Sequence, residues 1–147
     1  MIEEIVMRKH SLTICLFLAL FIPSISFAAN HHVRSDCAYN GNGTTWACAT
    51  VSGGTGAYKV LPATLVRGAT YYIADGSYPS YTVDDAVSGT SVITIKKATT
   101  SAHGTENGWD SSYGDGQAVF TSSGGMGGIF NIITSYVVFD GVVGSGS

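Results

Sequence analysis

The sequence predicts an all-β fold, on three observations. Residues 29–147 hold all 19 glycines together with 14 serines and 14 threonines. This excess of turn-forming and hydroxyl residues excludes a helical bundle or a coiled coil. Short runs of apolar β-branched and aromatic residues recur along the same segment, and the net charge of the chain is only −3, which argues against disorder. Because no basic field is present, we expect no nucleic-acid partner.

Residues 1–28 have the pattern of a signal peptide. An apolar core at residues 12–22 follows a basic pair, and small residues precede a cleavage site after Ala28. The core is too short to span the ~30 Å of hydrocarbon in a bilayer. We therefore expect no membrane anchor after signal cleavage and an exported protein, whether extracellular, periplasmic or at the cell surface. Translation could start at either Met1 or Met7.

Two cysteines, Cys37 and Cys48, remain after the predicted leader is removed. An even pair in an oxidising compartment predicts a disulfide, whose short loop would stabilise the fold by roughly 2–3 kcal/mol. The competing metal interpretation lacks a CxxC motif and a histidine pair at ligand spacing. His31 and His32 lie just after the cleavage site, so we interpret them as a mobile, solvated pair. The sequence therefore predicts a Cys37–Cys48 disulfide and no metal site.

The segment that follows is rich in turns and contains one candidate helix. Asn-Gly pairs within residues 37–57 favour the left-handed backbone conformations of tight turns. Residues 58–67 carry the candidate helix, with Leu61 and Leu65 one turn apart and Pro62 tolerable at its start.

The rest of the chain predicts short strands at wide spacing. They are expected at residues 71–73, 81–83, 92–96, 118–120, 129–132 and 136–141. Ile73 and Ile95 are 22 residues apart, and Ile95 and Phe139 are 44 apart, twice that number. A repeat of this size is typical of a solenoid, and the longer interval is read as one enlarged turn that carries an excursion over residues 98–117.

In a parallel solenoid, equivalent residues of successive strands lie above one another. The spacing places Tyr71 and Ile73, Ile93 and Ile95, and Val137 and Phe139 in such a ladder. An antiparallel sandwich built from the same strands is the alternative, and composition alone does not separate the two.

Three segments resemble right-handed parallel β-helix proteins of the pectin-lyase-like superfamily. Residues 67–78 are similar to the first turn of such proteins, with a small-residue turn, a short apolar strand, an Asp-Gly turn and a tyrosine. Residues 88–98 are similar to the next strand, and residues 135–141 to a strand one turn later. In order, the resemblance covers roughly residues 37–141; its motifs are moderately specific for the fold and poorly specific for activity.

The resemblance implies a right-handed parallel β-helix fragment with an N-terminal cap and one short helix. Residues 29–67 would form the disulfide-containing cap and residues 68–147 the first turns, truncated at the C-terminus. A cap covers the apolar end of a solenoid and its unpaired strand edges. The other end has no such cover, so we expect an N-terminal fragment that associates through this open edge. A short natural domain capped by a partner is the alternative.

The resemblance also implies that the full-length form is exported and acts on or binds polysaccharide, as a lyase or a glycoside hydrolase. Catalytic groups in this superfamily generally lie on later turns, beyond residue 147, and some lyases use Ca²⁺. We carry over no catalytic, cofactor-binding or metal-binding residue, and we expect the fragment itself to be inert. The alternative is a non-catalytic cell-surface or adhesion β-helix module.

Four acidic residues and one histidine are candidates for metal binding or acid–base chemistry. Asp84 and Asp85 could hold Ca²⁺, but adjacent acids more often occupy a solvated turn. Asp110 and Asp115 lack the spacing of an EF-hand. His103 is interpreted as a surface-loop histidine, because the sequence identifies no partner for it.

Two lysines and three aromatic residues are candidates for binding a glycan. Lys96 and Lys97 could contact an acidic glycan, or equally well discourage edge pairing at a strand end. Trp46, Trp109 and Tyr113 could stack on sugar rings, but burial beneath a loop is the favoured interpretation for the tryptophans.

Overall fold

A computed structural model describes residues 28–122 and 129–141, so the predicted leader up to residue 27 lies outside it. The described residues form eight strands and one 3-10 turn, and the all-β prediction is confirmed. No helix in this part of the chain is long and apolar enough to cross a membrane. The elements are β1 (Asn30–Val33), β2 (Thr70–Ile73), β3 (Gly76–Pro79), β4 (Tyr81–Val83), β5 (Ile93–Lys97), η2 (Ser111–Tyr113), β6 (Ala118–Thr121), β7 (Phe130–Ile132) and β8 (Val137–Asp140).

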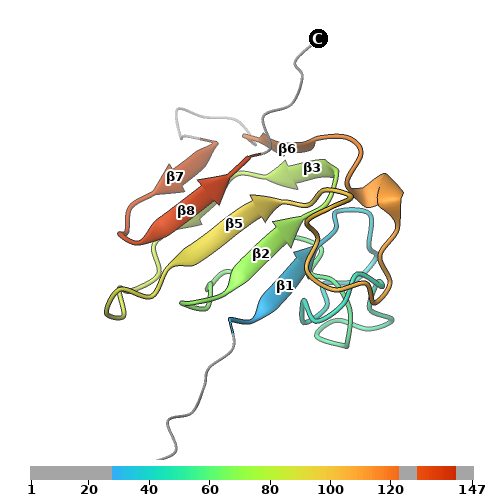
Figure 1. Cartoon of the computed structure of the whole chain (residues 1–147), viewed down its shortest axis with the longest axis horizontal. Coiled ribbons are helices and arrows are strands. Elements are labelled where there is room, and N and C mark those ends of the chain that lie inside the picture. Colours follow the sequence, from blue (N-terminus) through green and yellow to red (C-terminus); the bar gives the residue numbers. More distant parts are fainter. Residues whose placement is uncertain (1–27, 123–128, 142–147) are drawn as a thin grey trace, which may run out of the picture.

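All the paired strands run parallel. One sheet has four strands in the order β1-β2-β5-β8, which lie side by side in Figure 1. Two smaller sheets pair β3 with β6 and β4 with β7. The predicted parallel arrangement of the strands near residues 73, 95 and 139 is therefore confirmed. The antiparallel sandwich is wrong for the described strands.

The register of the four-stranded sheet differs from the predicted ladder at one step. Ile95 lies opposite Phe139, as predicted. On the other side, Ile95 lies opposite Tyr71, and Ile73 lies opposite Lys97. The predicted Ile73–Ile95 pairing is wrong by two residues. Because side chains alternate between the faces of a strand, a shift of two keeps the same residues facing inward.

The sheet begins with β1, before the segment expected to start the turns. The interpretation of His31 and His32 as a mobile, solvated pair is wrong, since both lie in β1 and His32 is only 1% exposed. The outer edge of β1 is covered by the chain that follows. The His32 amide donates to the Gly43 carbonyl (2.9 Å), and the Arg34 amide donates to the Tyr58 carbonyl (2.8 Å).

Residues 58–67 form no helix, so that prediction is wrong. Their polar backbone groups bond to other parts of the chain: the Leu65 amide donates to Asp85 Oδ1 (2.8 Å), and the Tyr81 hydroxyl donates to the Pro62 carbonyl (2.5 Å). These bonds replace the helical hydrogen bonds that the leucine spacing suggested. Leu61 and Leu65 are nevertheless buried against the core.

All three sheets contribute to one apolar core. It contains Val33, Leu61, Leu65, Ala69, Tyr71, Ile73, Tyr78, Val83, Ile93 and Ile95. Burial falls sharply at the last strands: Ile95 is 1% exposed and its partner Phe139 is 50% exposed, while Val83 is 0% exposed and its partner Ile132 is 46% exposed. The core is therefore closed beside β1 and accessible beside β8 in the described part of the chain.

Candidate functional site

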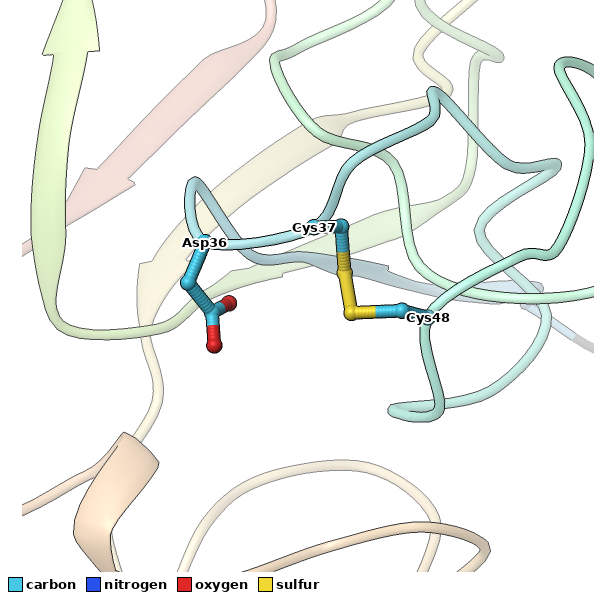
Figure 2. Close-up of side chains that lie close together, drawn as sticks. All are labelled: Asp36, Cys37 and Cys48. Carbon is cyan, nitrogen blue, oxygen red and sulfur yellow. A yellow bond between two sulfur atoms is a disulfide. The ribbon is translucent and has the colours of Figure 1, made fainter.

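The predicted disulfide is confirmed. Cys37 and Cys48 are bonded, with their Cα atoms 5.2 Å apart. Asp36 lies beside them (Figure 2), so that one oxygen and two sulfurs fall within 4.8 Å of one another. The group is not a metal site, because both sulfurs are consumed by the disulfide and Asp36 pairs with Arg34 at 2.6 Å. The disulfide closes the loop between residues 37 and 48, and a bond of this kind persists in a non-reducing environment.

The excursion over residues 98–117 folds back onto the cap and brings together the three aromatic residues that the sequence analysis selected. The Trp46 and Trp109 rings meet edge to face at 4.8 Å, and the Trp109 and Tyr113 rings do so at 5.7 Å. We call His32, Trp46, His103, Trp109 and Tyr113 the aromatic cluster. Trp46 is fully buried, so the burial interpretation is confirmed for it, while Trp109 and Tyr113 are half-buried.

Hydrogen bonds fix the excursion to the cap at this cluster. The Trp46 amide donates to the Asn107 carbonyl (2.9 Å), and Trp46 Nε1 donates to the His103 carbonyl (2.8 Å). The Arg34 guanidinium lies 3.8 Å from the centre of the Tyr113 ring, a cation–π contact. The buried Trp46 therefore holds the excursion in place through its hydrogen bonds and ring contacts.

His103 has a partner that the sequence analysis missed. Its ring stacks on Trp109 with the centres 4.1 Å apart, and its Nε2 lies 2.7 Å from Glu106 Oε1. Its Nδ1 lies 3.1 Å from the Thr99 carbonyl. The sequence signal was the spacing of three residues between His103 and Glu106. Because both ring nitrogens face acceptors, this histidine anchors the loop and offers no free nitrogen for proton abstraction.

His32 is the second histidine of the cluster. Its Nδ1 donates to the Gly43 carbonyl (2.9 Å), and its Nε2 accepts from the Thr105 amide (3.4 Å). This arrangement requires the neutral ring. Burial lowers the pKa of His32, and the nearby His31 and His103 lower it further, against a smaller opposite effect of the Gly43 bond. His32 thus joins β1, the cap and the excursion only while it is uncharged.

The outer face of the four-stranded sheet adjoins the aromatic cluster. Tyr72, Lys96 and Asp140 are in register on three neighbouring strands and face away from the buried Ile95. The Tyr72 ring lies 6.2 Å from the ring of His32. Lys96 Nζ pairs with Asp140 Oδ2 at 2.9 Å, and the hydrogen bond to that carboxylate raises the pKa of Lys96. This row is the candidate binding face.

Lys97 points to the opposite side of the same strand. Its Nζ pairs with Asp75 Oδ1 at 2.5 Å, and both side chains are largely buried. Lys97 lines a cavity of about 240 Å³ at the accessible end of the core, together with Ile95, Phe120 and Phe139. Lys96 and Lys97 do not serve to discourage pairing at a free sheet edge, so that interpretation is wrong: their strand, β5, lies between β2 and β8.

Of the four aspartates considered as Ca²⁺ ligands, two are held in structural hydrogen bonds and the other two are exposed. Asp84 is exposed as expected, but Asp85 is buried and accepts the Leu65 amide, so the solvated-turn interpretation is wrong for Asp85. Asp110 caps the 3-10 turn through the Ser112 amide and hydroxyl, and these bonds lower the pKa of Asp110. Asp115 is exposed.

Comparison of the chain with models of known protein families, with curated protein sequences and with solved structures finds no match. The candidate site is therefore defined by its geometry. It consists of the row Tyr72–Lys96–Asp140 on the outer face of the sheet, bordered by the excursion that the aromatic cluster holds in place.

Proposed function

We propose that this chain is the cap and first turns of an exported right-handed parallel β-helix protein whose full-length form binds or cleaves polysaccharide. One observation carries the proposal. The strands β2, β3 and β4 pair in order with β5, β6 and β7, and β8 then joins β5. This order is what a solenoid produces when each coil gives one strand to each of three sheets.

The candidate binding face supports a repetitive ligand. Neighbouring strands lie about 4.8 Å apart, so in-register residues form a row along the stacking direction. The row here presents the half-buried ring of Tyr72 and the amino group of Lys96, which also pairs with Asp140. An aromatic ring suits the apolar face of a sugar, and an amino group suits its acidic substituents. Thr70 and Thr94 form a second, parallel row of hydroxyls on the same outer face.

In this proposal the reaction itself belongs to later turns of the full-length protein. Three side chains considered as chemical groups are held in structural contacts: His103 with Glu106, Lys96 with Asp140, and Lys97 with Asp75. The segment then contributes the closed end of the solenoid and the first part of the binding face.

The test uses the full-length protein with pectate, alginate and a glycosaminoglycan. Ultraviolet-absorbing unsaturated products support a lyase, and new reducing ends without that absorbance support a hydrolase. Retention in affinity electrophoresis without products supports the alternative, a surface or adhesion module. The absence of both products and retention on all of these glycans would refute the polysaccharide proposal.

A matched pair of variants locates the binding face. Lys96→Ala should weaken retention by an acidic glycan, because it removes the amino group of the row. Lys59→Ala is the control, since Lys59 is an exposed lysine in the cap. Equal losses of retention in the two variants would show that the glycan responds to the net charge of the protein and does not bind specifically at this face.

A further inference from the structure

The chain contains three Asn-Gly pairs, at 40–41, 42–43 and 107–108. At such a pair, the deprotonated glycine nitrogen can attack the side-chain amide carbon of the asparagine. A new C–N bond closes a succinimide ring as the bond to the side-chain nitrogen breaks and ammonia leaves. Water then opens the ring to aspartate or isoaspartate. Glycine permits this approach because it has no Cβ that would block it. Asparagine is counted among the thermolabile residues, and this reaction makes it so.

Two of the three pairs are locked by hydrogen bonds. The Gly41 amide donates to the Ala57 carbonyl (2.9 Å), and the Gly43 amide donates to the Gly56 carbonyl (2.7 Å). The asparagine oxygens are also engaged: Asn40 Oδ1 accepts the Lys59 amide at 2.8 Å, and Asn42 Oδ1 accepts the Thr44 hydroxyl at 2.7 Å. The attacking nitrogen and the target amide are therefore both held in place.

The third pair is different in every one of these respects. Asn107 and Gly108 are both exposed. Among the described residues, neither the Gly108 amide nor the Asn107 side chain takes part in a hydrogen bond. We propose that Asn107 is a site of spontaneous deamidation in the folded protein, whereas Asn40 and Asn42 are protected.

Packing at position 108 excludes any residue larger than glycine, so the Asn-Gly pair cannot be removed by substituting Gly108. Gly108 has φ +76°, in the left-handed region, and a Cβ added there would lie 2.5 Å from the Ala47 amide nitrogen. A larger residue would have to break the contact between excursion and cap. The close approach that fixes the excursion thus places a reactive Asn-Gly pair on its surface.

Deamidation would act directly on the aromatic cluster. The Asn107 carbonyl accepts the Trp46 amide (2.9 Å). Isoaspartate routes the backbone through the former side chain, which inserts a methylene group and displaces this carbonyl. Either product also adds a negative charge next to Glu106, the partner of His103. We expect the modified protein to hold its excursion more loosely.

The experiment follows the full chain during incubation in mildly alkaline buffer, with peptide mapping by mass spectrometry and chromatographic separation of the isoaspartate form. Because Asn40 and Asn42 can react only after hydrogen bonds open, Asn107 should convert at least about tenfold faster than either. In denaturant, the three sites should convert at similar rates. Tryptophan fluorescence and proteolysis of residues 98–117 report whether the excursion loosens as Asn107 converts.

Asn107→Gln is the matched control, since it keeps an amide while lengthening the side chain beyond an easy five-membered ring. The variant should show neither the mass change at position 107 nor the gradual change in fluorescence. Conversion of Asn40 or Asn42 at the rate of Asn107 in the folded protein would overturn the proposal. So would an Asn107 that stays intact while the denatured chain reacts.

Discussion

Arg67 joins three loops that precede consecutive strands of the four-stranded sheet. It lies just before β2. Its guanidinium donates to the carbonyls of Asp85 (2.5 Å) and Ala86 (3.1 Å), which precede β5. It also donates to the carbonyl of Ser135 (2.7 Å) and the hydroxyl of Thr134 (2.8 Å), which precede β8. The structure thus predicts that replacing Arg67 weakens the attachment of β8.

The magnitude follows from the environment of these bonds. Two are partly buried, to the Asp85 carbonyl and the Thr134 hydroxyl, and the others are exposed. At about 1 kcal/mol for each partly buried bond and about half that for each exposed one, Arg67→Ala should lower the free energy of unfolding by about 2–4 kcal/mol. Arg67→Lys should lose about half as much, because a single ammonium cannot reach both loops.

Urea denaturation followed by circular dichroism measures the overall loss, and hydrogen exchange locates it. The amide of Ile93 donates to the Tyr136 carbonyl, one of the carbonyls that Arg67 also contacts. Its exchange should accelerate more than that of amides between β1 and β2. Arg67→Lys controls for the loss of charge.

Wild-type stability in Arg67→Ala would refute this reasoning, because water would then replace all the bonds at no loss. Equal destabilisation of the β1–β2 amides and the β5–β8 amides would also count against it. That outcome would make Arg67 a general stabilising residue rather than a link between successive loops.

Three further predictions concern the disulfide, a buried histidine and the accessible end of the core. Replacing both Cys37 and Cys48 by serine should lower the free energy of unfolding by about 2–3 kcal/mol, measured in urea without reductant; an unchanged midpoint would contradict it. Burial lowers the pKa of His32 below its ordinary value of 6.5, so the unfolded chain binds the proton first as pH falls. The free energy of unfolding should therefore decrease as pH falls below about 6.5. His32→Gln should reduce this decrease, and His31, whose pKa is also lowered by burial, accounts for part of what remains; an equal slope in the variant and the wild type would be the contrary result. Sedimentation should show concentration-dependent association that Phe139→Asp reduces, since Phe139 is 50% exposed at the end of the core; a wild-type monomer at all concentrations would contradict this.

Much of the strand arrangement could be predicted because inward side chains alternate and recur. The runs around Ile73, Ile95 and Phe139 identified three neighbours of one parallel sheet. The step from Tyr71 to Ile95 could not be placed correctly, since a pattern of period two fits equally well after a shift of two residues. Only the backbone pairing distinguishes the two registers.

The errors around the cap have a common physical origin in long-range contacts. Nothing local to His32 distinguishes a frayed end from a strand, because its burial depends on Trp46 and on the excursion. The leucines at 61 and 65 have helical spacing, but the Leu65 amide bonds to Asp85, which lies twenty residues away. Tertiary hydrogen bonds decided the local structure in both places.

The candidate site was only partly accessible to sequence reasoning. Trp46, Trp109 and Tyr113 were correctly selected as residues of interest, and the structure brings them together. The row on the outer face was missed, because Tyr72 and Asp140 acquire meaning only once β2, β5 and β8 are known to be neighbours. Residues far apart in sequence cannot be grouped without that pairing.

The covering of β1 by Gly43 and Tyr58 has a consequence for how the sheet can grow. On that margin the His32 amide and carbonyl and the Arg34 amide are already bonded to the chain's own loop, so an incoming strand would have to displace these bonds. Among the described residues, no such backbone bonds are made on the outer side of β8, the opposite edge of the four-stranded sheet. Lengthening of the four-stranded sheet, by further chain or by another molecule, is therefore favoured beside β8 over β1.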